Sequence, residues 1–328
     1  MRYATHYDVG ERKRDEGINE DSVALTVFEQ GHREGYCGQR VTPSSDARSR
    51  PANRGAAAVA LADGAGGHDA GDVASYIAST VVCEQLADVV VRAARGDPDP
   101  FDVSLTQTPD VPTAANLRGA VADAIVAAHR EIIANAATGS GGAYATVVAG
   151  IVVDGQFHYG WVGDSRAYLI NSATETISRL TRDHAVVEQL QQSGAVDEAE
   201  ARVHPRGNEI TRALGGSGSE DPTSATVSVE TASVEVYAED TLLVTSDGLI
   251  DAQTDAPQLH DAYVDDGRSD AAADRIHDAV VTDAEVRDAV LNAGTLESAA
   301  ATLIELANAR GGKDNLSTLL LRDQTFPE

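Results

Sequence analysis

Residues 59–71 read Val59-Ala60-Leu61-Ala62-Asp63-Gly64-Ala65-Gly66-Gly67-His68-Asp69-Ala70-Gly71. The first four form a short apolar run that suits a buried strand, and the Asp-Gly that follows fits a sharp turn with a carboxylate at the strand tip. The glycines allow close backbone approach that a Cβ would forbid. A carboxylate and a bare carbonyl at a rigid strand end can bind a hard cation, which prefers oxygen ligands. Because a single Asp-Gly is usually an ordinary turn, other segments must supply further ligands.

Acidic residues recur at the ends of other apolar runs. The sequence places them beside predicted strands over residues 22–28, 156–162, 241–246 and 316–321, and they are Glu20-Asp21, Asp164, Asp247 and Asp314. If these strands lie side by side, their ends converge, and clustered carboxylates repel one another unless cations hold them. Mg²⁺ and Mn²⁺ are the natural occupants of such a site. Each carboxylate alone is equally typical of a solvated acidic surface, so the recurrence is what favours a metal centre.

The charge balance is strongly acidic. The 328 residues include 25 basic and 52 acidic side chains, which gives a net charge of −27. Such a surface repels nucleic acid and anionic membranes, so we expect neither as a partner. Lys13 and Lys313 are the only lysines. A low-lysine, Asp/Glu-rich chain resembles proteins of salt-loving archaea and bacteria, in which salt screens the self-repulsion, and the alternative is an ordinary acidic cytosolic protein.

Cysteine usage and the N-terminus indicate a cytoplasmic protein. Cys37 and Cys83 form neither a disulfide framework nor a metal-ligand spacing. The N-terminal residues lack the apolar region of a signal peptide. No uninterrupted apolar segment approaches membrane-spanning length, so we expect no membrane association.

The order of predicted elements is typical of a single α+β domain over residues 1–328. Strands are predicted at 3–9, 22–28, 143–153, 156–162, 167–170, 227–236, 241–246 and 316–321, with Asp154-Gly155 as a two-residue hairpin turn. Helices are predicted at 72–95, 113–137, 185–193, 283–292 and 295–310. Residues 29–55 are rich in Gly, Arg and Ser, which predicts an irregular insert. Residues 181–222 are predicted to form a mobile insert. The structure of residues 255–280 stays open.

Six motifs, in this order along the chain, resemble those of the metal-dependent PPM/PP2C serine/threonine phosphatases of the bacterial and archaeal type. They are Asn19-Glu20-Asp21, Asp63-Gly64-Ala65-Gly66-Gly67-His68, Gly163-Asp164-Ser165-Arg166-Ala167-Tyr168, Leu180-Thr181-Arg182-Asp183-His184, Ser246-Asp247-Gly248-Leu249 and Asp314-Asn315-Leu316-Ser317. The resemblance implies a four-layer α-β-β-α sandwich with two central antiparallel sheets and a dinuclear Mn²⁺/Mg²⁺ centre at one edge. Residues 181–222 would be the flap beside the active site.

The resemblance also implies the ligands of the metals. Asp63 would bridge two ions and the Gly64 carbonyl would add a ligand, while Asp247 and Asp314 would hold one ion. Glu20-Asp21 would hold the other ion directly or through water. Asp164 matches the position that, with Asp247, supports a third and weaker metal in bacterial-type members.

A pair of cations about 3.5–4 Å apart can share a water, lower its pKa and aim a hydroxide at phosphorus. The family reaction is hydrolysis of phosphoserine or phosphothreonine in proteins, so the implied partners are phosphoproteins made by a serine/threonine kinase. The cations also neutralise charge on the phosphoryl oxygens. No nucleophilic side chain is needed, and no catalytic side chain is assigned.

Two positions depart from the family pattern. The family sets a phosphate-binding arginine three residues before the Asn-Glu-Asp, where this chain has Glu16. Arg14 is our candidate phosphate ligand, with Arg12 in reserve, because a guanidinium can grip phosphate with two hydrogen bonds. Ala65 stands where eukaryotic members have a histidine, so the general acid is unassigned, and His68 is interpreted as a structural residue.

Two alternatives to a general protein phosphatase stay open, and the missing arginine motivates the first of them. The chain could be a non-catalytic pseudophosphatase that binds phosphoproteins through the same fold. It could also be a phosphatase dedicated to one regulator, of the anti-sigma antagonist type.

Overall fold

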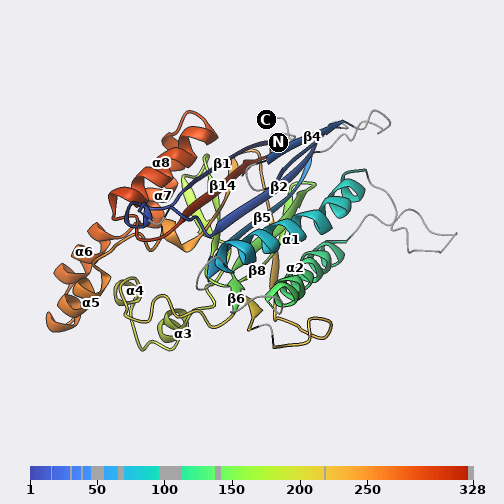
Figure 1. The fold of residues 1–328 in the computed structure, drawn as a ribbon. Helices are drawn as coiled ribbons and strands as arrows, with labels where there is room; N and C mark the ends of the chain where they lie inside the picture. Colours follow the sequence, from blue (N-terminus) through green and yellow to red (C-terminus); the bar gives the residue numbers. More distant parts are fainter. Residues whose placement is uncertain are drawn as a thin grey trace.

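Two antiparallel sheets lie face to face between two pairs of helices in the computed structural model (Figure 1). The structure describes residues 1–15, 17–29, 32–37, 40–45, 55–65, 70–95, 113–136, 142–217 and 219–323. The order of layers is α-β-β-α, and every strand pairing in these ranges is antiparallel, as the sequence predicts.

The first sheet joins the two ends of the chain. Its strands, in spatial order, are β1 (Arg2–Asp8), β14 (Leu316–Arg322), β13 (Asp240–Thr245), β9 (Arg166–Asn171) and β10 (Thr176–Arg179). Helices α7 (Asp283–Asn292) and α8 (Leu296–Ala309) cover its outer face, and both begin at threonine-led capping boxes.

The second sheet contains the segment with Asp63. Its order is β12 (Glu230–Glu235), β8 (Gln156–Val162), β7 (Val147–Val153), β5 (Ala56–Ala65), β2 (Asp21–Glu29), β3 (His32–Cys37) and β4 (Arg40–Ser45). The short strands β6 (Ala143–Ala145) and β11 (Leu214–Gly216) extend the end of β5. Helices α1 (Ala70–Arg95) and α2 (Ala114–Ala136) cover its outer face.

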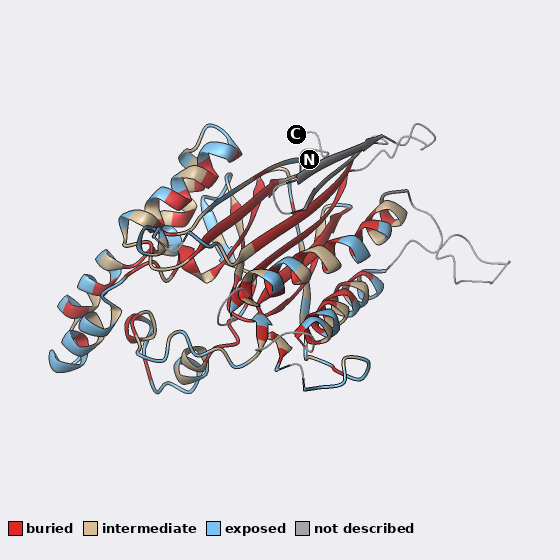
Figure 2. Ribbon diagram, in the orientation of Figure 1, coloured by how far each residue is buried: buried red, intermediate tan, exposed pale blue. Residues whose placement is uncertain are grey.

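The central strands are buried on both faces because their side chains alternate between two apolar layers. Along β5, Ala57, Val59 and Leu61 join the core between the sheets, and the intervening alanines pack beneath α1 and α2. Figure 2 shows these strands as the buried centre of the molecule. The near-continuous apolar runs of β2, β5 and β7 are typical of strands covered on both sides.

Helix α1 bears on the expectation about membrane-spanning length. Within the described ranges it is long and apolar enough, over Ala70–Ala93, to cross a membrane by length and composition alone. The expectation concerned uninterrupted apolar segments, and charged residues at Asp72, Glu84, Asp88 and Arg92 interrupt this helix. Half of this window is buried inside the protein, where Ala74, Ala78 and Val82 pack on the second sheet. The core helix of a globular domain meets the same criterion.

The region beside the sandwich consists of short helices. They are η1 (Glu11–Lys13), α3 (Val186–Gln192), α4 (Glu198–Ala201), η2 (Asp247–Leu249), α5 (Ala256–Asp265) and α6 (Asp270–Ala279). Residues 255–280, left open by the sequence, form α5 and α6. A small core that includes Val203, Tyr263 and Ile276 packs the 181–222 segment against them.

The irregular insert predicted over residues 29–55 is wrong in part. Strands β3 and β4 form a hairpin that continues the second sheet outward from β2. Backbone hydrogen bonds to β2 stabilise this hairpin without an alternating apolar pattern. A prediction from composition therefore could not identify it. Residues 30–31, 38–39 and 46–54 of this stretch lie outside the described residues.

Candidate metal centre

The ends of five strands bring the predicted acidic residues to one edge of the sandwich. Asp21 and Asp63 lie directly opposite each other at the paired ends of β2 and β5. Asp247 follows β13, and Asp314 precedes β14 next to it. Asp164 follows β8. The sequence motifs thus meet in space although they are far apart along the chain.

The glycines that follow Asp63 and Asp247 are required by close backbone approach. A Cβ on Gly64 would lie 2.0 Å from the carbonyl oxygen of Gly71 and 2.8 Å from that of Glu20. A Cβ on Gly248 would lie 2.0 Å from the carbonyl oxygen of Asn315. Real Cβ atoms do not approach so closely, so any larger residue would force the strand ends apart.

Hydrogen bonds from neighbouring segments hold the carboxylates in place. Ser246 Oγ donates to Asp21 Oδ2 at 2.8 Å, and Thr146 Oγ1 accepts from the Asp63 backbone N–H at 3.1 Å. The buried Asn315 side chain accepts from the Glu20 N–H at 2.9 Å and donates to two carbonyls of the same connection. The Glu20-Asp21 segment is therefore fixed by the residue that follows Asp314.

The carboxylates disfavour one another's ionisation. Burial raises the pKa of Asp63 well above its usual range, and Asp21 and Asp247 raise it further. Burial likewise raises the pKa of Asp21 to about 6, although the hydrogen bond from Ser246 lowers it. The pKa of Asp247 is also raised, first by burial and then by Asp164. Such a group is stable in its ionised form only when positive charge is close.

Two observations fit this site to hard divalent cations. The carboxyl atoms Asp21 Oδ1 and Asp247 Oδ1 are buried and have no hydrogen-bond partner. The Lys13 ammonium contacts two other carboxylates of the cluster: it donates to Asp314 Oδ1 and lies 4.0 Å from Glu20 Oε2. An all-oxygen donor set with unsatisfied buried atoms suits Mn²⁺ or Mg²⁺.

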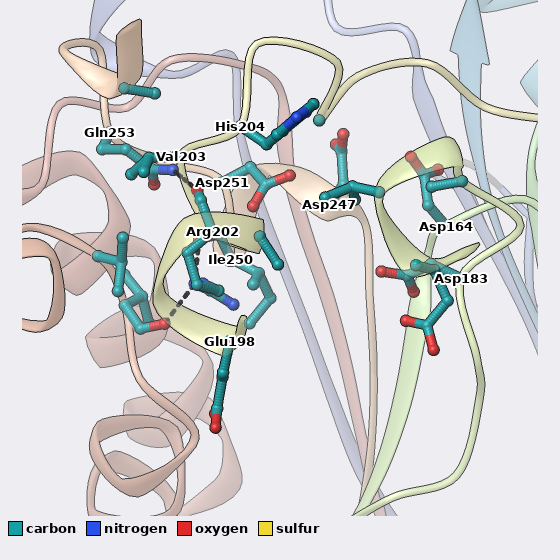
Figure 3. Close-up of a pocket in the computed structure, with 18 of the residues that line it drawn as sticks. Asp164, Asp183, Glu198, Arg202, Val203, His204, Asp247, Ile250, Asp251 and Gln253 are labelled. Carbon is teal, nitrogen blue, oxygen red and sulfur yellow. Dashed lines mark hydrogen bonds between the residues drawn. The ribbon is translucent and has the colours of Figure 1, made fainter. Parts of the chain in front are cut away.

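A polar cavity of about 240 Å³ adjoins this edge and is walled by the 181–222 segment (Figure 3). Asp164 and Asp247 line it together with Asp183 and Asp251. Burial raises the pKa of Asp164 to about 7, with Asp183 and then Asp251 adding to the effect. Asp183 is paired with Arg166 at 2.7 Å. Asp251 carries no such pairing in the described contacts and faces the same cavity.

Sequence reasoning missed Lys13 and Asp251. Lys13 lies between Arg12 and Arg14, and the 3₁₀ turn η1 decides which of the three faces the carboxylates. Asp251 follows Asp247 by four residues, and its N–H donates to the Asp247 carbonyl at 2.8 Å. An aspartate one helical turn after a strand-end Asp-Gly is the signal that could have identified Asp251.

Neither of the two predicted phosphate ligands, Arg14 and Arg12, contacts the carboxylate cluster in the described contacts. Arg14 pairs with Glu11 at 2.9 Å, and both side chains are more than half exposed. Arg12 is exposed, and its backbone N–H donates to the Gly312 carbonyl. Their role in phosphate binding stays a prediction. Glu16 and His68 lie outside the described residues.

The α-β-β-α sandwich and the carboxylate cluster at its edge define a metal-dependent hydrolase. The model of the family described as protein phosphatase 2C matches residues 37–280. The chain belongs to the protein phosphatase 2C family.

Relatives by sequence are bacterial phosphatases. The serine/threonine phosphatase stp of Listeria monocytogenes is 30% identical over 270 residues, which cover 81% of this chain and 85% of the relative. The protein phosphatase PhpP of Streptococcus pneumoniae is 27% identical over 87% of this chain and 93% of its own length.

Solved structures of the same fold cover nearly the whole chain. The serine/threonine phosphatase PstP/Ppp of Mycobacterium tuberculosis is 26% identical with a TM-score of 0.62, over 97% of each chain. The catalytic domain of the phosphatase PstP, solved with two manganese ions, is 25% identical with a TM-score of 0.60, over 97% of this chain and 96% of that one. The Mn²⁺ or Mg²⁺ cofactor predicted from the sequence fits this family.

Proposed function

We propose that this protein hydrolyses phosphoserine and phosphothreonine in proteins at a centre of two Mn²⁺ or Mg²⁺ ions. The observation that carries the proposal is the cluster around Asp63, whose pKa is raised by burial and by four further aspartates that the strand ends bring together. The residues that would hold the two ions are Glu20, Asp21, Asp63, the carbonyl of Gly64, Asp247 and Asp314. Asp164, with Asp247, would support a third.

Each protein group has a separate task in this proposal. Bound Mn²⁺ or Mg²⁺ would supply an activated water and charge neutralisation at the phosphoryl oxygens. Ser246 and Asn315 hold the Asp21 segment in position. Lys13, the basic residue of the 12–14 run that reaches the carboxylates, would donate to a phosphoryl oxygen of the substrate.

The substrate class is inferred from the relatives and from the cavity. The matched relatives carry the names serine/threonine phosphatase and protein phosphatase. The cavity beside the carboxylates opens between the 181–222 segment and the sandwich, where a phosphorylated peptide could approach. A serine/threonine kinase would produce these substrates, and we place the reaction in the cytoplasm.

Removal of the metal or of a single ligand tests the proposal. Turnover of a phosphothreonine peptide is measured with Mn²⁺, with EDTA, and for Asp63→Asn and Asp247→Asn. We expect losses greater than about 100-fold, because even residues that only support metal ligands are worth about 10–100-fold. Asp123→Asn, on the exposed face of α2, is the matched control and should keep full activity. Full turnover in EDTA, or in both ligand variants, contradicts the proposal.

Peptide binding and turnover of p-nitrophenyl phosphate, measured on the same protein, separate the alternatives. A pseudophosphatase would bind the phosphopeptide with Mn²⁺ present and release it unchanged. A phosphatase dedicated to one regulator would turn over p-nitrophenyl phosphate but leave a panel of unrelated phosphopeptides intact.

A further inference from the structure

A second group of metal-binding side chains lies between the 181–222 segment and helix α5. Glu200 is in α4, His204 follows that helix, and His260 is in α5. Each offers one ligand atom, and these atoms all lie within 4.8 Å of one another. The group shares no residue with the carboxylate centre, so it is a separate cluster.

His260 directs Nε2 towards Glu200 and leaves Nδ1 buried. Its Nε2 lies 3.6 Å from Glu200 Oε1, and its Nδ1 lies 3.5 Å from Asp261 Oδ1. Nδ1 is buried and has no hydrogen-bond partner. Nε2 is therefore the nitrogen of His260 that faces the cluster.

Glu200 is held in one orientation by two hydrogen bonds. Arg268 donates to Oε2 at 2.7 Å through Nε and to Oε1 at 3.1 Å through Nη2. Glu200 is buried, yet each carboxylate oxygen keeps a second lone pair for another ligand. Arg268 thus positions the carboxylate.

His204 completes the cluster from the other side. Its ring meets that of His260 edge to face, with centroids 5.5 Å apart. Its Nδ1 accepts a hydrogen bond from the Arg206 backbone N–H at 3.1 Å. A metal at Nδ1 would replace this hydrogen bond, and a metal at Nε2 would require the tautomer with its proton on Nδ1.

We propose that Glu200, His204 and His260 form a zinc-type transition-metal site. Two imidazoles and one carboxylate, completed by a water as the fourth ligand, are the donor set of tetrahedral zinc sites. Mg²⁺ and Mn²⁺ prefer oxygen ligands, so the two centres of this protein select different metals.

A bound ion would fasten the 181–222 segment to α5. His204 and Asp247 line the same cavity, so the ion would fix part of the cavity wall. The site itself does not depend on the proposed phosphatase reaction, and its test does not use activity.

Co²⁺ is the probe for this site, because four-coordinate cobalt with nitrogen ligands absorbs visible light far more strongly than six-coordinate cobalt with oxygen ligands. The full chain is titrated with Co²⁺ in excess Mg²⁺, which occupies the carboxylate centre. We expect an intense band that saturates at one equivalent and is abolished by stoichiometric Zn²⁺. The band should persist in Asp63→Asn, which damages the other centre.

Single substitutions locate the ligands. His260→Ala should remove the band and His204→Ala should weaken Co²⁺ binding more than about tenfold, as expected for loss of a ligand. His277→Ala, an exposed histidine on neighbouring α6, is the control and should leave the band unchanged. An absent band, a band that survives His260→Ala, or one lost in Asp63→Asn overturns the proposal.

A measurement on the unsubstituted protein guards against variants that fail to fold. Carbethoxylation of histidines, mapped by mass spectrometry, is compared with and without one equivalent of Zn²⁺ in excess Mg²⁺. Zn²⁺ should slow the reaction at His204 and His260 at least about tenfold and leave His277 unaffected. Equal reactivity of His204 and His260 in both samples overturns the proposal.

Discussion

Lys13 shows how the fold brings one of three consecutive basic residues to the carboxylates at the edge of the sandwich. Burial alone would lower its pKa, but the hydrogen bond to Asp314 and the nearby acidic groups more than offset this and raise it. The ammonium is therefore charged at neutral pH. It stands among the carboxylates that would hold the metals, where a phosphoryl group would approach.

Substitution of Lys13 tests this assignment. Lys13→Ala should lower kcat/KM for a phosphopeptide about 10–100-fold, since a hydrogen bond to a charged group is worth about 1.5–3 kcal/mol. Lys13→Arg should recover most of the loss. Steady-state kinetics of Arg14→Ala and Arg12→Ala, the sequence-based candidates, provide the comparison. A greater loss in Arg14→Ala than in Lys13→Ala would reverse the assignment.

The acidic residues illustrate what was predictable at this scale. Asp63 and Asp247 stand out in the sequence because each interrupts an apolar run and is followed by glycine. Their convergence with Asp314 needed only the assumption that the strands are neighbours. The choice among Arg12, Lys13 and Arg14 was not predictable, because a 3₁₀ turn directs consecutive side chains about 120° apart.

At the scale of elements, the end of β5 depends on the absence of a side chain at Gly64. Gly64→Ala should lower the free energy of unfolding by about 2 kcal/mol or more, as expected for overpacking, because the new Cβ meets the Gly71 carbonyl. Urea denaturation followed by circular dichroism measures this change, and Mn²⁺ affinity should fall with it.

The control for Gly64→Ala is Gly119→Ala in α2. No atom lies within 4 Å of the added Cβ there, so the substitution should stabilise the helix by up to about 1 kcal/mol. If the two alanine variants change stability equally, close approach at Gly64 is not the cause.

The contact between α2 and β11 makes stability depend on pH. His129 Nδ1 accepts the Gly215 N–H at 3.0 Å, and its Nε2 is buried without a partner. Burial lowers the pKa of His129 from 6.5, so the unfolded chain takes up a proton more readily than the folded one. Neutral His129 therefore contributes its full share of stability above pH 6.5, and this share is lost as pH falls towards the pKa of His129 in the folded protein.

The His129 contribution is measured as a difference between proteins. Between pH 7 and pH 5, the unfolding free energy of the unsubstituted protein should fall more steeply than that of His129→Gln. The excess slope is at most about 1.4 kcal/mol per pH unit for one group. Parallel pH profiles for the two proteins would show that His129 does not titrate in this way.

At the scale of the whole molecule, the net charge of −27 sets the dependence on salt. Self-repulsion of this size destabilises the compact state and is screened by salt, with a Debye length of about 10 Å at 0.1 M and about 3 Å at 1 M. We expect the unfolding midpoint and the activity to rise between low and molar KCl. Sucrose at matched osmolality is the control, and equal stability and activity without salt would contradict the halophilic interpretation.

The sequence by itself determined an α+β domain whose central strands are covered on both faces, because those signals are local, whereas the four-layer sandwich was implied by the resemblance of six motifs to a known family. The apolar runs of β2, β5 and β7 require cover on both faces wherever they lie. Asp154-Gly155 makes a hairpin turn because both residues adopt positive φ, 52° and 70°, as such turns require. The hairpin of β3 and β4 escaped prediction because pairing with β2 stabilises it through the backbone, which leaves no side-chain pattern.

Only the tertiary structure decided which side chains share a site. Glu200 and His204 meet His260 because a small apolar core packs α4 against α5 and α6. Lys13 meets Asp314 because the Arg12 N–H is bonded to the Gly312 carbonyl, which joins the two ends of the chain. Local conformation follows from neighbouring residues, whereas these contacts depend on the packing of segments far apart in the chain.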